Sequence, residues 1–212
     1  MVQRKKDDVR DAICAAAFRL FSAQGYSATS LPQIAREAGI STANVYVYFG
    51  SKLEVLFSVY APWLRERLDR LDDTLERIDD PLRRLERLLL ALWRDLPRES
   101  NGFANNVMQA ISTSAPDGEY SPALREFFQQ RVAAWVRRST GGSQRQADRT
   151  ASVLLMAFDG FAMNARLKQG VACTPAMAAL MAKALLDSAG RSALPAANAG
   201  VRTRIDGRRR EA

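Results

Sequence analysis

The sequence predicts an all-α protein, in which a small N-terminal head of three helices precedes a larger helical domain. Apolar residues recur at spacings of three and four along most of the chain, which is the period of an α-helix. Period-two alternation bounded by hairpin turns, the pattern of strands, is not sustained in any segment. We therefore expect a head over residues 1–55, a helical domain over 56–189 and a flexible basic tail over 190–212.

The first two expected helices have clear apolar faces and clear ends. The apolar face of the first consists of Val9, Ile13, Ala16, Ala17, Leu20 and Phe21. Gly25 would end it, because glycine adopts positive φ without strain. The second begins at Ser30, where residues 30–33 form a capping-box pattern with proline in the first turn. Gly39 would end that helix after the apolar stripe Leu31, Ile34, Ala35 and Ala38.

The third helix of the head is short, and a longer helix follows it. Ser41 is the expected N-cap of the third helix, with Val45 and Phe49 on its inner face. Residues 51–54 then form another capping-box pattern and open the longer helix. Pro62 lies inside it, which predicts a kink or a break at that position.

The larger domain is predicted to contain five further helices. They would cover residues 81–96, 102–114, 122–139, 144–169 and 175–188. Three of these helices begin with proline directly after a good N-cap, namely Asp80, Ser121 or Thr174. From Gly190 onward, alanine, glycine, proline and arginine dominate without periodicity, which predicts the flexible tail.

The charge of the chain favours a polyanionic partner without proving one. The chain has 212 residues, a net charge of +8 and 47% hydrophobic residues, enough for a sizeable core. Residues 191–212 contain six arginines against two acidic residues, so half of the excess charge lies in the predicted tail. Arg4, Lys5 and Lys6 are interpreted as a solvated terminus rather than a DNA-contacting arm.

The chemistry-bearing residues argue against an enzyme or a metal site. The chain has no histidine and only two cysteines, Cys14 and Cys173, which we expect to be buried thiols in a reducing compartment. A zinc site cannot be assembled from this set. The sequence also lacks a Gly-rich phosphate loop, a nucleophile elbow and paired carboxylates. We expect no catalytic residue, no metal and no cofactor.

No segment predicts insertion into a membrane. The longest apolar stretches, residues 88–93 and 151–163, are too short to span a bilayer, and the second contains Asp159. The N-terminus begins with charged residues and has no apolar signal core. We therefore expect a cytoplasmic protein.

Residues 38–41 connect the second and third helices in the pattern of a helix-turn-helix. Glycine permits the tight reversal, and Ser41 caps the helix that follows. This cap leaves the positive end of the third helix facing outward, where a DNA phosphate would bind. Lys52, at the start of the next helix, would add a positive charge for the DNA backbone.

The outer surface of the third helix suits the major groove of DNA. Its positions are Thr42, Ala43, Asn44, Tyr46 and Tyr48. Asn44 would pair bidentately with an adenine edge, and Thr42 and Ala43 would meet a thymine methyl group. The hydroxyls of Tyr46 and Tyr48 would donate to phosphate. In the simpler alternatives Tyr46 packs against the preceding helix and Asn44 is only a solvated residue.

Four stretches of the head stand in an order and spacing that are typical of one family. They are AFRLF at residues 17–21, GYSATS at 25–30, IAREAGIS at 34–41 and VYVYFGSK at 45–52. Through them, residues 10–63 resemble the DNA-binding head of the TetR (tetracycline repressor) family. Thr42 and Ala43 depart from the pattern, since family members often carry Lys or Arg and then Gly there.

The resemblance implies a function as well as a fold. It implies a homodimeric repressor that binds a palindromic operator in double-stranded DNA and is released by a small-molecule effector. By position it implies that Thr29 and Lys52 contact phosphate. An alternative is a helical interaction or adaptor protein that keeps the fold without reading DNA.

Two helices of the larger domain are apolar over too much of their surface to be buried on one side only. The residues concerned are Val153, Leu154, Met156, Ala157, Phe161 and Leu167, and then Met177, Leu180, Met181, Ala184 and Leu185. Pairing of these helices across a two-fold axis would bury them, and the resemblance implies the same dimer. Gly160 would permit a close approach of helices, and Asp159 is interpreted as a structural hydrogen-bonding group.

The middle helices would surround an effector pocket. Its apolar walls would come from Trp93, Phe103, Met108, Phe127, Phe128, Trp135 and Met156. Its polar groups would be Asn105, Asn106 and Gln109. Such a pocket suits a hydrophobic or aromatic molecule. The alternative, that these residues only fill the core, stays open for each of them.

Overall fold

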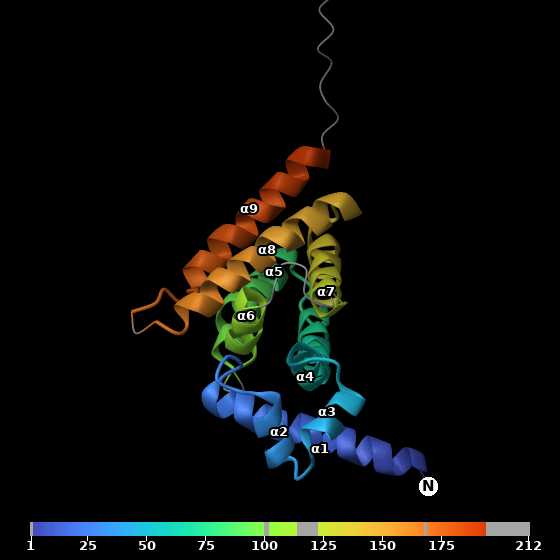
Figure 1. Cartoon of the computed structure of the whole chain (residues 1–212). Helices are drawn as coiled ribbons and strands as arrows, with labels where there is room; N and C mark the ends of the chain where they lie inside the picture. The colour runs from blue at the N-terminus through green and yellow to red at the C-terminus, as the bar shows by residue number, and fades with distance from the viewer. Residues whose placement is uncertain (1, 100–101, 114–122, 168, 194–212) are drawn as a thin grey trace, which may run out of the picture.

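The computed structural model describes residues 2–99, 102–113, 123–167 and 169–193, and these residues form helices and turns without a strand. The head contains α1 (Val2–Gln24), α2 (Leu31–Glu37) and α3 (Thr42–Tyr48). The body contains α4 (Lys52–Glu76), α5 (Pro81–Leu90), α6 (Phe103–Thr113), α7 (Ala123–Thr140), α8 (Gln144–Asn164) and α9 (Pro175–Ala193). The head lies at one end of the molecule and α8 and α9 lie toward the other (Figure 1). The all-α prediction is confirmed.

The ends of the head helices follow the predicted local signals. Gly25 and Gly39 have φ of 85° and 71°, which explains why glycine stands where α1 and α2 end. Ser30 and Gln33 form the predicted capping box, in which the Ser30 N–H donates to Gln33 Oε1 at 2.8 Å. Ser41 caps α3, since its Oγ accepts a hydrogen bond from the Asn44 N–H at 3.2 Å.

The helix α4 extends from the head into the body, and it corrects two details of the prediction. The predicted break at Pro62 is absent, because one missing backbone donor costs less than the packing of the buried leucines on both sides, among them Leu56 and Leu64, while the predicted kink stays a prediction. The capping box at its start is also shifted by one residue. Glu54 accepts from the Gly50 N–H at 2.7 Å, whereas Ser51 Oγ accepts from the Glu54 N–H at 3.1 Å.

The body helices differ from the prediction mainly at their C-terminal ends. The helix that begins at Pro81 continues through a π-helical turn, η1 (Ala91–Asp95), into a short 3₁₀ turn, η2 (Leu96–Arg98). α8 ends at Asn164 rather than at residue 169, and α9 runs beyond the predicted end at residue 188. The predicted helix start at Ser121 and the tail from residue 194 lie outside the described residues.

One contiguous core connects the head with the body. α4 contributes fully buried side chains along its length, from Leu56 through Tyr60 to Leu68. α9 packs on α5, and α8 packs on α7. Within the described ranges, no helix combines the length and the apolar character that crossing a membrane requires.

Candidate nucleic-acid interface and effector region

The outer face of α3 is free of the core. Val45 and Phe49 are buried at 0% and 1% exposure and hold the helix from its inner side. Tyr46 is 58% exposed and Val47 is 70% exposed. Tyr46 therefore does not pack into the core, and the alternative that part of its ring packs against the preceding helix stays open.

The other predicted reading residues lie on or beside the same face. Ala43 and Asn44 are exposed, and Thr42 and Tyr48 are half-buried. The N-cap Ser41 is exposed as well, so the first turn of α3 faces solvent. A polar amide and two phenol rings are thus presented together on a short helix. The contacts of these side chains with base edges and phosphates stay predictions.

Lys52 and Thr29 are engaged within the head. The Lys52 ammonium donates to the carbonyl oxygens of Tyr26 at 2.9 Å and Thr29 at 2.8 Å. It lies 4.0 Å from the centre of the Tyr26 ring, and burial lowers the pKa of Lys52. An ammonium has a third donor, so its phosphate contact stays a prediction.

The expectation for Thr29 is corrected. Its side chain is 2% exposed, and its hydroxyl donates to the Gly25 carbonyl oxygen at 2.8 Å. The hydroxyl therefore holds the turn between α1 and α2 and is not presented to a phosphate. A buried backbone carbonyl needs a donor, and the threonine supplies it.

Asn106 and Gln109 join α6 to the head. The Asn106 amide is fully buried and donates to the Phe21 carbonyl oxygen at 3.0 Å and to the Tyr60 hydroxyl at 2.8 Å. Gln109 Oε1 accepts a hydrogen bond from the Ser27 N–H at 2.9 Å. Both side chains therefore point toward the head and not into an effector pocket, which corrects their predicted role.

Tyr60 is a residue of this joint that the sequence analysis missed. Its side chain is fully buried, and burial raises the pKa of its phenol. Tyr60 stands four residues after Leu56 and four before Leu64 on the apolar face of α4. A buried phenol needs a hydrogen-bonding partner. A tyrosine on the apolar face of a helix therefore predicts a polar residue on a neighbouring helix.

A small apolar cavity of about 50 Å³ lies inside the body. Two of the predicted wall residues, Phe103 and Phe128, line it. The other lining residues are Phe57, Leu64, Val107, Ile111, Leu124, Arg125, Leu155, Phe158 and Asp159. Arg125 and Asp159 form the polar part, with Nη1 and Oδ2 separated by 3.9 Å. Burial raises the pKa of Asp159, and the charge of Arg125 opposes that rise.

The other predicted wall residues lie elsewhere. The Trp93 indole donates to the Leu154 carbonyl oxygen at 3.0 Å and stacks on Phe161, with ring centres 5.4 Å apart. The Trp135 indole donates to Asp72 Oδ1 at 2.7 Å and so fastens α7 to α4. These two tryptophans are structural residues, because each indole N–H is used to connect two elements of the core.

Four more residues of the predicted pocket also lie away from the cavity lining that the structure describes. Met156 is 64% exposed on α8, because the inner face of that helix is occupied by its neighbours. The Arg65 guanidinium lies over the Phe127 ring, 5.3 Å from the centre of that ring. Asn105 and Met108 are half-buried on α6.

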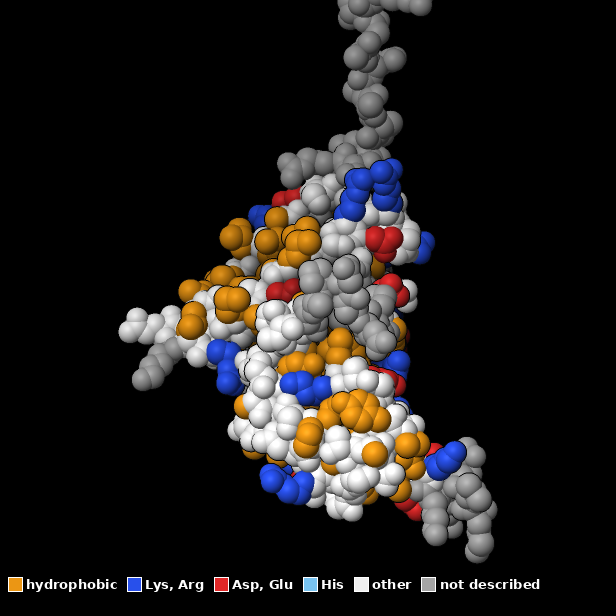
Figure 2. Space-filling view, in the orientation of Figure 1, with side chains coloured by type: hydrophobic (Ala, Val, Ile, Leu, Met, Phe, Trp, Pro, Cys, Tyr) orange, Lys and Arg blue, Asp and Glu red, His pale blue; other side chains and the backbone are white. Residues whose placement is uncertain are grey.

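Apolar side chains gather on one face of the body, over α8 and α9 (Figure 2). The exposed members of this face are Val153, Met156, Met163, Leu167, Met177, Leu180 and Met181. Leu180 is 75% exposed, the highest value among the large apolar residues of the described chain. Gly160 is exposed on the same stretch of α8, and a Cβ built there would meet no neighbouring atom within 4 Å.

Comparison with known proteins begins with the head. Residues 13–59 match the model of bacterial regulatory proteins of the tetR family. The HTH-type transcriptional regulator HbdR of Aromatoleum sp. (strain CIB) is 51% identical over 51 residues, which are 24% of this chain and 22% of HbdR. The HTH-type transcriptional regulator SrpR of Pseudomonas putida is 47% identical over 55 residues, 26% of each chain. The matched segment therefore spans about a quarter of the length of these curated relatives.

The fold is shared over most of the chain with a solved TetR-family structure. The regulator PfmR of Thermus thermophilus is 26% identical and superposes with a TM-score of 0.51, over 85% of this chain and 94% of PfmR. A head of three helices with a capped turn, carried on a helical body, defines a helix-turn-helix protein. The head matches the tetR family of bacterial regulatory proteins over residues 13–59, and the whole fold is similar to that of a solved regulator of that family.

Proposed function

We propose that the chain is a sequence-specific transcriptional regulator, a repressor that binds DNA through α3. The observation that carries this proposal is the outer face of α3, where Asn44 and Tyr46 are exposed beside a capped helix start. Asn44 suits an adenine edge in the major groove. Tyr46 suits a phosphate at its rim. The head would correspond to residues 1–55 and the remainder of the described chain to an effector and dimerisation domain.

We propose further that the regulator acts as a homodimer through α8 and α9. The exposed apolar face described above supports this, because a second copy of the same face would cover it across a two-fold axis. A dimer carries two copies of α3, and these would read two half-sites related by the same axis. The operator is then palindromic, with half-sites about one helical turn, ~34 Å, or a multiple of it apart.

The effector would enter the apolar cavity and act on the head through α6. The cavity of about 50 Å³ is smaller than the ~300–1,000 Å³ of sites that enclose small molecules, so an effector must displace its walls. α6 supplies Phe103 and Val107 to that wall and holds the head through Asn106 and Gln109. A hydrophobic or aromatic effector that moves α6 would therefore move the head.

Selection of duplex DNA from a random pool by the purified full chain tests this function. Binding to the recovered sequence is then measured at several salt concentrations, since phosphate contacts weaken with salt. We expect a palindrome. Asn44→Ala should bind it about tenfold or more weakly and lose preference at one base pair. Gln130→Ala, at an exposed position on α7, is the matched control and should bind like the parent.

Two outcomes would contradict the proposal in different ways. If a folded, dimeric Asn44→Ala protein binds the selected DNA as tightly as the parent, the docking of α3 is wrong. If no palindrome is recovered, and binding is weak and abolished by salt, the protein is better explained as a helical adaptor that does not read DNA.

A further inference from the structure

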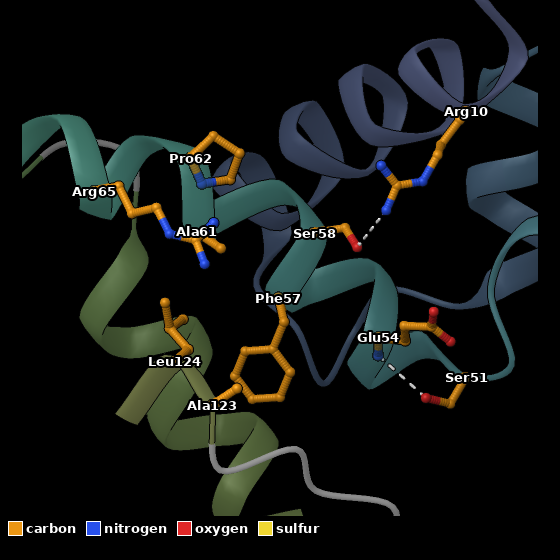
Figure 3. Close-up of a pocket in the computed structure, with 10 residues that line it drawn as sticks. All are labelled: Arg10, Ser51, Glu54, Phe57, Ser58, Ala61, Pro62, Arg65, Ala123 and Leu124. Carbon is orange, nitrogen blue, oxygen red and sulfur yellow. Dashed lines mark hydrogen bonds between the residues drawn. The ribbon is translucent and has the colours of Figure 1, made fainter. Parts of the chain in front are cut away.

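A groove of about 520 Å³ lies where the head meets the body. It is formed by α1, by the first half of α4 and by the first residues of α7 (Figure 3). Phe57 and Leu124 line both this groove and the apolar cavity, so they form the partition between the two. The groove volume falls within the ~300–1,000 Å³ of sites that hold small organic molecules.

Two arginines give the groove an excess of positive charge. Arg10 reaches from α1 toward α4, where its Nη2 donates to Ser58 Oγ at 3.3 Å (Figure 3). Arg65 lies further along α4. Neither guanidinium has a carboxylate partner among the residues that the structure describes. The one acidic residue of the lining, Glu54, is engaged by the Gly50 N–H at 2.7 Å.

Arg10 contacts a second element without an acidic partner among the residues that the structure describes. Several other arginines that connect separate segments have acidic partners there. Arg131 pairs with Asp69 at 2.8 Å, Arg138 with Glu76 at 3.0 Å, and Arg67 with Glu99 at 2.8 Å. Among the described residues, Arg10 meets a serine hydroxyl on α4 and the face of the Phe49 ring. An anion from outside the chain would complete this arrangement.

The walls of the groove are mixed, with serine hydroxyls and charged groups beside an apolar part. Phe57, Ala61 and Leu124 form that apolar part (Figure 3). A hydrated inorganic ion gains nothing from it, whereas a ligand with an apolar body removes its surface from water. The guanidinium fork matches a carboxylate, with which it forms two parallel hydrogen bonds.

We propose that this groove binds a small organic carboxylate with an apolar body, such as an aromatic acid. The carboxylate pairs with Arg10 and Arg65, and the apolar body lies against Phe57 and Leu124. The bound acid thereby connects α1 of the head with α4 and α7 of the body. This site is separate from the apolar cavity of the proposed effector, and its occupation requires no DNA.

Isothermal titration calorimetry on the full chain tests the site. The probes are benzoate, phenylacetate and 4-methylpentanoate, with benzyl alcohol and benzylamine as the neutral and cationic analogues. We expect at least one acid to bind and both analogues to fail. Arg10→Gln and Arg65→Gln should each weaken that acid about tenfold or more, because each loses a charged hydrogen bond. Arg83→Gln, at an exposed position on α5, should bind like the parent.

A second variant tests the space rather than the charge. Ala61→Trp keeps both arginines and fills the groove with an indole, so binding of the acid should be lost while the circular dichroism spectrum stays helical. The proposal is overturned if none of the acids binds, if benzyl alcohol binds as well as benzoate, or if the arginine variants bind unchanged. Loss of binding in Arg125→Gln, with Arg65→Gln unaffected, would place the acid in the apolar cavity instead. The titration results do not depend on the DNA selection. Either proposal can therefore be contradicted while the other stands.

Discussion

Lys52 illustrates how one side chain closes a turn that lies far from it in the sequence. Its ammonium donates to two carbonyl oxygens of the segment between α1 and α2, at Tyr26 and Thr29. The carbonyl oxygens of this turn need hydrogen-bond donors from outside it. An ammonium supplies several donors at one point. The first turn of α4 is thereby connected to the start of α2.

Replacement of Lys52 by alanine should lower the free energy of unfolding by about 1–2 kcal/mol, because two partly buried carbonyls lose a charged donor. Urea denaturation followed by circular dichroism measures this. Lys183→Ala, at an exposed position on α9, should stay within about 0.5 kcal/mol of the parent. Equal midpoints for the two variants would show that the Lys52 contacts do not stabilise the head.

The buried Tyr60 hydroxyl should make the stability fall at alkaline pH. Burial raises the pKa of Tyr60 above its ordinary value of about 10. The unfolded phenol therefore loses its proton first, the folded state holds more protons, and stability falls as the pH rises through that interval. Denaturant midpoints between about pH 9 and 11 should fall less steeply for Tyr60→Phe than for the parent. Tyr46→Phe, at an exposed position, should keep the steep fall, and an unchanged slope in Tyr60→Phe would contradict the argument.

At the scale of the element, α2 and α3 depend on the turn between them. Each helix has only seven residues, fewer than an isolated helix needs to be stable in water. Gly39 has a φ of 71°, and a Cβ built on it would meet no atom within 4 Å. Glycine is therefore required at position 39 by the positive φ of the backbone, and not by steric crowding around its Cα.

Gly39→Ala should cost about 1–2 kcal/mol of stability, which is the cost of a left-handed conformation for a residue with a Cβ. Gly190→Ala in α9 is the matched control, because it lies in a helix with open space around it and should stabilise by about 0.5–1 kcal/mol. Thermal unfolding of both variants gives the comparison. A neutral Gly39→Ala would mean that the turn relaxes to negative φ.

The starts of the helices could be predicted from the sequence, and several of their ends and partners could not. Ser30, Ser41 and Asp80 act through hydrogen bonds to residues two or three positions away, so the local sequence contains the whole signal. The end of α8 and the continuity of α4 through Pro62 depend on tertiary packing. The sequence marks Asn106 as an inward polar residue, but helical periodicity does not tell which neighbouring element such a residue meets.

At the scale of the whole molecule, the exposed apolar face of α8 and α9 decides the assembly that we propose. Leu180 and Met156 are each more than half exposed in the single chain. Burial of such side chains stabilises an interface by about 25 cal/mol for each Å² of apolar surface removed from water. A charge placed at the centre of this face would be buried without a partner.

Leu180→Glu should therefore convert the dimer to a monomer at micromolar concentration, as measured by analytical ultracentrifugation. Binding to the selected palindrome should fall in parallel, because one head then reads one half-site. Ala134→Glu adds the same charge at an exposed position on α7 and should remain dimeric. A Leu180→Glu protein that sediments like the parent would exclude this face as the interface.

The continuous helix α4 connects the head with the body and can transmit a tilt from one to the other. Its 25 residues span about 37 Å at 1.5 Å per residue. Its first turn lies against the head, and its last turn is joined to α7 by the ion pair between Glu76 and Arg138. A rigid rod of this length that tilts by about 5° at one end moves its other end by about 3 Å. That displacement is close to the ~3.4 Å rise of one base pair, so in the proposed dimer a slight rearrangement around an effector would shift each head by about one step along the DNA.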